Sequence, residues 1–193
     1  MIPAALIIAV WLRYSNPWAL RAWVITVGVT YSIVALSKLL FKGWGLSFEP
    51  LDIAVLSGHA MNTCLMLTVA LSLLARQFNP VLRWPAAWAG LLASAWFSAY
   101  CVAPYIHPLN EALAGATLGA VAAITFLWRI ESTDIKVSPS FIGGGLVVLL
   151  ACALVAQYYA EVLLHRVAIT LSGADQAHQE PSWRLDAAHG KPE

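Results

Sequence analysis

Residues 19–41 of the chain read ALRAWVITVGVTYSIVALSKLLF, a hydrophobic stretch that contains two charged residues, Arg21 and Lys38. As a helix, a stretch of this length crosses the ~30 Å hydrocarbon layer of a bilayer at 1.5 Å per residue. The whole chain has the same character, because hydrophobic residues make up 60% of its 193 residues and charged residues 11%. Soluble domains carry roughly 25% charged residues. The composition therefore predicts a membrane protein, whose outer surface faces lipid.

Five further apolar stretches follow the same pattern, with short polar segments between them. We predict helices over residues 2–12, 19–41, 57–75, 84–102, 111–128 and 141–164. The first is short for a span, so we expect it to be tilted or incomplete. The predicted fold is all-α, a polytopic membrane bundle of about six transmembrane helices within residues 1–172. Residues 173–193 are polar, and we expect a disordered tail there because they offer little apolar area to bury.

Basic residues are divided unequally between the two ends of the predicted bundle. One end collects Arg13, Arg21, Arg76, Arg83, Arg129 and Lys136, and the other collects Lys38, Lys42 and Arg166. By the positive-inside rule, the first end faces the cytoplasm. The second end, which carries the loops with His59 and His107, is then predicted to face the outside.

Charge and cysteine usage exclude several classes of function. The formal net charge is +1, and no basic run is fit to follow a nucleic-acid backbone, so no nucleic-acid partner is expected. The three cysteines, Cys64, Cys101 and Cys152, lie in separate apolar stretches without the spacing of metal ligands. We therefore predict no metal and no cofactor. No pattern in the sequence identifies a protein partner.

Three segments place ionisable side chains at the same predicted end of the bundle. They are Lys38 near the end of the second helix, Ser57–His59 at the start of the third, and His107 with Glu111 at the start of the fifth. Because successive helices alternate in direction, these three points share one side. Ionisable groups close to the hydrocarbon layer are costly to keep and indicate function. Their coincidence predicts a polar site at this end.

The residue types suit the chemistry of a phosphate ester. If a helix begins at His107, Glu111 lies on the same face and accepts the proton of one ring nitrogen, which leaves the other free to attack or take a proton. The start of the third helix offers exposed amides as an anion site. There Ser57 adds a hydroxyl donor, Gly58 allows close approach of the backbone, and His59 can act as a general acid.

Lys38 adds a fixed positive charge, and the set as a whole suits a phosphate monoester or diphosphate. In their order along the chain these residues resemble the type-2 phosphatidic acid phosphatase superfamily, over roughly residues 36–119. The similarity is greatest to a bacterial subgroup with Gly-Trp-Gly in its first motif, as at residues 43–45, and glutamate in its third, which here ends at Gly115. The resemblance implies a multi-pass protein of the bacterial inner (cell) membrane, with its active-site face toward the periplasm.

The resemblance also implies a role for each site residue. His107 would be the nucleophile that forms a phosphohistidine, Glu111 would orient it, and His59 would protonate the leaving group. The phosphate-binding residues would be Lys38, Ser57 and Gly58, the last through its amide. The implied function is that of a membrane lipid phosphatase-like protein. It hydrolyses a phosphate or diphosphate from a lipid substrate, with membrane lipids around it.

The chain departs from the family pattern at two arginines. The family's first motif normally ends in Arg-Pro, where this chain has Gly45-Leu46, and its third begins with Ser-Arg, where this chain has Tyr100-Cys101. A bidentate guanidinium is the usual partner of phosphoryl oxygens. Besides a working, weakened hydrolase, the sequence leaves open a catalytically impaired member that binds a lipid headgroup or a partner subunit. Transfer of phosphoryl groups between lipids is a third alternative.

Overall fold

The computed structural model describes residues 2–103, 107–136 and 166–173. Within these ranges the chain is all-helical, as predicted, and its β-structure is limited to an isolated antiparallel bridge between Phe48 and Ile53. The elements are α1 (Ile2–Ser15), α2 (Pro17–Trp44), η1 (Glu49–Leu51), α3 (Gly58–Phe78), η2 (Pro80–Leu82), α4 (Arg83–Phe97), η3 (Ser98–Val102) and α5 (Leu109–Arg129). Residues 166–172 are also helical. The helix predicted at 141–164 and the tail beyond residue 173 lie outside the described residues.

Local capping sets both ends of α2. The Asn16 side chain accepts hydrogen bonds from the backbone amides of Trp18 (2.9 Å) and Ala19 (3.1 Å). Pro17 occupies the first helical position, where a missing N–H costs nothing. At the other end Gly45 has φ 69°, a left-handed conformation that glycine adopts without strain. One of the two positions where the resembled family carries Arg-Pro therefore serves here to end a helix.

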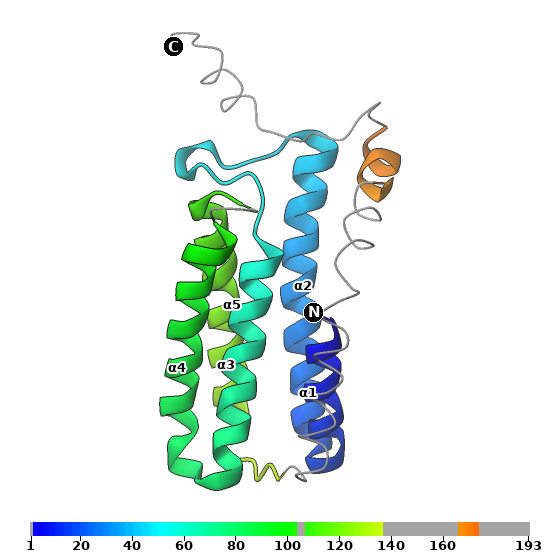
Figure 1. Ribbon diagram of the computed structural model, residues 1–193. Helices are drawn as coiled ribbons and strands as arrows, with labels where there is room; N and C mark the ends of the chain where they lie inside the picture. Colours follow the sequence, from blue (N-terminus) through cyan, green and yellow to red (C-terminus); the bar gives the residue numbers. More distant parts are fainter. Residues whose placement is uncertain (1, 104–106, 137–165, 174–193) are drawn as a thin grey trace.

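Helix direction alternates along the chain, so that the C-terminal end of α2 and the N-terminal ends of α3 and α5 lie at one end of the bundle (Figure 1). Helix α3 packs against both α4 and α5, while α2 packs against α1 and α5. The rings of Trp23 and Phe126 meet edge to face with centroids 5.0 Å apart, which joins α2 to α5. The Trp23 Nε1–H also donates to the Ala5 carbonyl at 2.9 Å and so fixes α1.

Small residues let α3 and α5 approach more closely than ordinary side chains would permit. A methyl group at Gly115 would collide with the Ser57 carbonyl oxygen, and one at Gly119 would collide with the Met61 carbonyl oxygen. These glycines therefore belong to a packing surface of α5, of the type that brings membrane helices together.

The opposite end of the bundle is closed by an arginine cluster. The Arg76 Nη2 donates to the carbonyl oxygens of Ile130 (3.1 Å) and Glu131 (2.9 Å), just beyond α5. The Glu131 carboxylate pairs with Arg83 and accepts from the Trp84 Nε1–H. These contacts hold the end of α5 to α3 and α4, and they lie at the end that the sequence predicts to be rich in basic residues.

Helices α2, α3 and α5 are each long and apolar enough to cross a membrane, and α1 is a shorter apolar helix. Many large apolar side chains face outward along the bundle. Examples are Val24, Ile25, Val29 and Leu36 on α2, and Trp88, Leu92 and Trp96 on α4. Such a surface is unfavourable in water and favourable against lipid. The described part of the chain thus has the apolar spanning helices and the apolar outer surface of a membrane protein.

Candidate functional site

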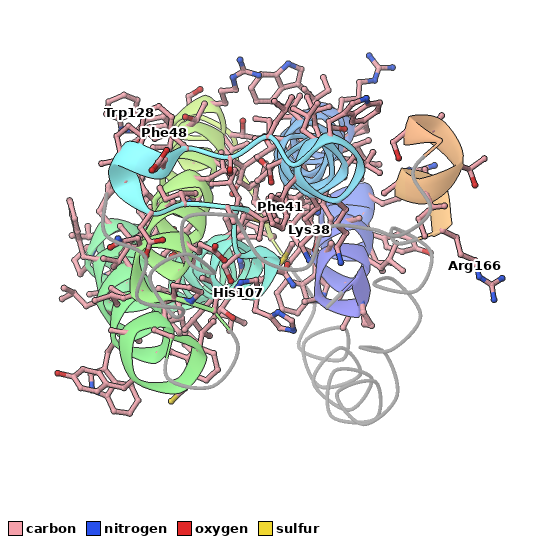
Figure 2. All side chains as sticks on the ribbon, turned by 90° about the horizontal axis from the view of Figure 1, so that it is seen from above. Lys38, Phe41, Phe48, His107, Trp128 and Arg166 are labelled. Atoms are coloured by element: carbon pink, nitrogen blue, oxygen red, sulfur yellow. The ribbon has the colours of Figure 1, made fainter. Side chains whose placement is uncertain are left out.

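Every residue predicted to form the site lies at the end of the bundle where α2 finishes and α3 and α5 begin. Lys38 lies two turns before the end of α2, and His59 is the second residue of α3. Glu111 lies in the first turn of α5, and His107 precedes that helix. Seen from above, Lys38 and His107 lie toward the middle of this end, whereas Arg166 lies at its outer edge (Figure 2).

His107 and Glu111 form a direct pair. The distance from His107 Nδ1 to Glu111 Oε2 is 2.8 Å, and the Glu111 residue is 2% exposed. An ionised carboxylate only accepts hydrogen bonds, so Nδ1 is the donor and the neutral ring keeps its lone pair on Nε2. One premise of the sequence analysis is wrong, because Pro108 is in an extended conformation and α5 begins at Leu109. The pair forms although His107 lies outside the helix.

The Glu111 residue also ties two further segments to the site. Its Oε1 accepts from the Ala54 amide at 3.1 Å. Its backbone carbonyl accepts from the Ser57 amide at 3.2 Å. A single buried residue thus connects His107, the segment before α3 and the start of α3. The sequence analysis missed Ala54, for which the sole signal was the apolar run at residues 53–56.

Ser57 is the N-cap of α3 and is fully buried. Its Oγ accepts from the Ala60 amide at 3.4 Å, which leaves the hydroxyl hydrogen available to another acceptor. The amides of Gly58 and His59 follow in the first helical turn, where backbone N–H groups have no intrahelical acceptor. The start of α3 thus carries the groups on which the predicted anion site depends, and anion binding there stays a prediction.

Ser37, which the sequence analysis did not identify, links α2 to this helix start. Its Oγ accepts from the Leu56 amide at 3.2 Å and donates to the Val34 carbonyl at 2.9 Å. The neighbouring Lys38 is buried, as expected when the stem of a lysine lies in apolar surroundings. Through Ser37, the helix that carries Lys38 is fixed directly to the segment that carries Ser57.

Cys101 occupies the position at which the resembled family has an arginine. It is half-buried with a free thiol, within the π-helical turn η3. The next residue, Val102, accepts a hydrogen bond from the His107 amide at 3.4 Å. A side chain at position 101 therefore starts close to the segment that holds His107.

No group of three His, Cys, Asp or Glu side chains suited to hold a metal ion occurs in the part of the chain that the structure describes.

The chain is similar to a protein of Klebsiella pneumoniae described as an uncharacterized 22.5 kDa protein in cps region. The two are 32% identical over 152 residues, which cover 79% of this chain and 73% of the relative. No family model matches the chain, and no solved structure matches it significantly.

Proposed function

The chain belongs to the same family as the Klebsiella pneumoniae cps-region protein, and we propose that it is a lipid phosphatase of the membrane. It removes a phosphate or diphosphate from a lipid substrate through a phosphohistidine intermediate. The observation that carries the proposal is the 2.8 Å contact between His107 Nδ1 and the buried Glu111 carboxylate. That contact orients a nucleophilic Nε2 at the same end as an open helix start and a lysine.

In the proposed reaction the His107 Nε2 attacks phosphorus, and the bond from phosphorus to the lipid oxygen breaks. His59 gives its proton to that oxygen, so that the lipid leaves as an alcohol. A water molecule then attacks the phosphohistidine, His59 takes the proton of that water, and inorganic phosphate departs. The phosphoryl oxygens are held by Lys38, the Ser57 hydroxyl and the Gly58 amide. Such positioning and charge stabilisation dominate phosphoryl transfer.

The proposed setting is a bacterial inner membrane, crossed by about six helices within residues 1–172, with the site facing the periplasm. Three apolar helices of spanning length support this setting. The arginine cluster at the opposite end of the bundle supports the orientation, since basic residues favour the cytoplasmic side. An impermeant thiol reagent should label an Asn110→Cys variant in intact spheroplasts. Labelling solely after the inner face is exposed would reverse this orientation.

A second candidate function is a catalytically impaired relative that binds a lipid headgroup or a partner subunit. It is favoured by one observation, the cysteine at position 101 beside the segment that holds His107. A lysine cannot reproduce the two parallel hydrogen bonds of a guanidinium to a phosphoryl group.

Replacing Cys101 by arginine separates the two candidates. In a working hydrolase, Cys101→Arg restores the two parallel hydrogen bonds from a guanidinium to the phosphoryl group. It raises kcat by ~10-fold or more, since arginine contacts in phosphoryl transfer contribute at least that much. In a relative that has lost catalysis, the same change leaves an unpaired guanidinium, costs several kcal/mol of stability and yields no activity. Release of inorganic phosphate from a panel of lipid phosphates, together with thermal unfolding, measures both. Cys101→Ala is the control for loss of the thiol.

A further inference from the structure

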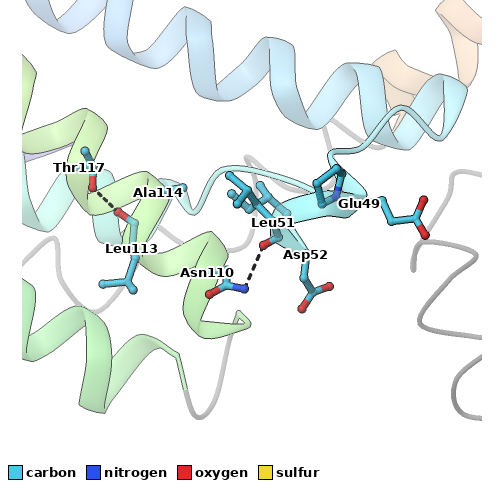
Figure 3. Close-up of a pocket in the computed structure, with 9 residues that line it drawn as sticks. Glu49, Leu51, Asp52, Asn110, Leu113, Ala114 and Thr117 are labelled. Atoms are coloured by element: carbon cyan, nitrogen blue, oxygen red, sulfur yellow. Dashed lines mark hydrogen bonds between the residues drawn. The ribbon is translucent and has the colours of Figure 1, made fainter.

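A cavity of about 480 Å³ lies beside the candidate site, between the η1 segment and the first two turns of α5 (Figure 3). On the α5 side it is lined by Asn110, Leu113, Ala114 and Thr117. Residues at this spacing share one helical face, which extends for about 10 Å along the helix axis. The cavity therefore runs from the polar end of the bundle down the outer side of α5.

On each wall of the cavity, one lining residue directly precedes a residue that belongs to the site or contacts it. Asn110 directly precedes Glu111, and Ile53 directly precedes Ala54, whose amide donates to the Glu111 carboxylate. The Asn110 Nδ2 also donates to the Leu51 carbonyl at 2.9 Å, so that η1 is tied to α5 across the cavity (Figure 3). The cavity thus adjoins the residues that hold His107 in place.

The lining of the cavity does not suit a phosphate group. The Asn110 Nδ2 donates to the Leu51 carbonyl, and the Thr117 hydroxyl donates to the Leu113 carbonyl at 2.8 Å. Glu49 and Asp52 add carboxylates, and among the described residues that line the cavity none is basic. A phosphate therefore stays on the side of His107, and the part of the ligand in the cavity carries no negative charge.

Two residues that line the cavity are exposed apolar side chains. Leu51 is 56% exposed, and Leu113 is 44% exposed. Large exposed apolar side chains at a helix end suit the level where headgroups meet lipid chains. The cavity therefore opens toward the boundary between lipid headgroups and lipid chains, from which an amphiphilic substrate would enter.

We propose that this cavity receives the first part of the lipid chain of the substrate, next to the phosphate ester. The chain then passes over Ala114 and Thr117 into the bilayer, while the phosphate lies at His107. This inference rests on the proposed function and names the substrate class as a lipid phosphate with an uncharged chain directly behind the phosphate.

Filling the cavity tests this placement. Ala114→Trp is expected to lower kcat/KM for hexadecyl phosphate by ~10-fold or more, because steric exclusion from an apolar pocket gives discrimination of this size. It should leave hydrolysis of the small soluble ester p-nitrophenyl phosphate unchanged. Ala114→Leu should have the same effect to a smaller degree. Ala89→Trp, the same substitution at an exposed position on α4, is the matched control and should affect neither substrate. Equal effects of Ala114→Trp and Ala89→Trp on hexadecyl phosphate would overturn the inference.

A second measurement does not depend on turnover. A hexadecyl phosphate analogue with a photoreactive diazirine near the phosphate should label the α5 face from Asn110 to Thr117, and Ala114→Trp should reduce that labelling. Labelling confined to other helices would refute the cavity as the chain site even if hydrolysis is observed. If no phosphate ester is hydrolysed, the proposed function fails, and labelling of this face still decides whether the cavity binds the lipid.

Discussion

Gly115→Ala is expected to lower the rate of phosphate release about 10²-fold and to destabilise the protein. The added methyl group would collide with the Ser57 carbonyl oxygen, and neither backbone can move without breaking the 3.2 Å bond from the Ser57 amide to the Glu111 carbonyl. Overpacking of this kind costs about 1–3 kcal/mol. A displacement of 1 Å near a reacting group can lower the rate about 10²-fold. Lipid phosphate hydrolysis and thermal unfolding in detergent measure the two effects.

Two other glycines provide the controls for this prediction. Gly28→Ala is expected to be tolerated, because open space surrounds a methyl group there. Gly119→Ala should lower stability by a similar amount, because the added methyl group meets the Met61 carbonyl oxygen one turn deeper. This variant should reduce the rate of phosphate release less than Gly115→Ala does. Full activity of Gly115→Ala would show that the close approach of α5 to Ser57 is not needed for the site.

Glu111→Gln is expected to lower kcat by roughly 10⁴-fold, the loss seen when the orienting acid of a catalytic histidine is removed. The glutamate accepts from both His107 Nδ1 and the Ala54 amide. A glutamine has one acceptor oxygen and would turn its NH₂ group toward one of these two donors. A buried donor left without its acceptor costs about 1–3 kcal/mol, so stability should also fall.

Glu131→Gln is the matched control for this change. Glu131 pairs with the Arg83 side chain and accepts from Trp84, at the opposite end of the bundle. The Glu131→Gln variant should be less stable, but its kcat for phosphate release per folded molecule should be unchanged. If Glu111→Gln retains the native kcat, the pairing of Glu111 with His107 is a structural contact and not a catalytic one.

The helices could be predicted from sequence because their signals are local. Residues 19–41 needed no partner to indicate a span, and the structure extends this helix to Pro17–Trp44, with Asn16 as its N-cap. Alternation of helix direction was then sufficient to place Lys38, Ser57 and His107 at one end. The fifth helix, predicted from residue 111, begins at Leu109, and it does not extend back to His107 because the backbone of Pro108 is extended.

The wall between the site and the cavity could not be predicted, because it depends on contacts between distant residues. Glu49 and Asp52 both line the cavity. That segment is held by the bonds from Ala54 to Glu111 and from Asn110 to Leu51. The sequence around these residues does not indicate their partners. Every residue except proline has a backbone amide that can donate, so nothing in the sequence singles out the amide of Ala54.

The most direct test of the proposed phosphatase is detection of a phosphorylated His107. Purified protein mixed with a lipid phosphate and quenched at alkaline pH should carry one phosphoryl group on His107, identified by mass spectrometry. His107→Ala should fold normally, carry no phosphoryl group and release phosphate ~10³-fold more slowly or not at all, as expected for loss of a nucleophile. Phosphate release by His107→Ala at the native rate, or a phosphoryl group on a different residue, would contradict the role of His107 as the nucleophile.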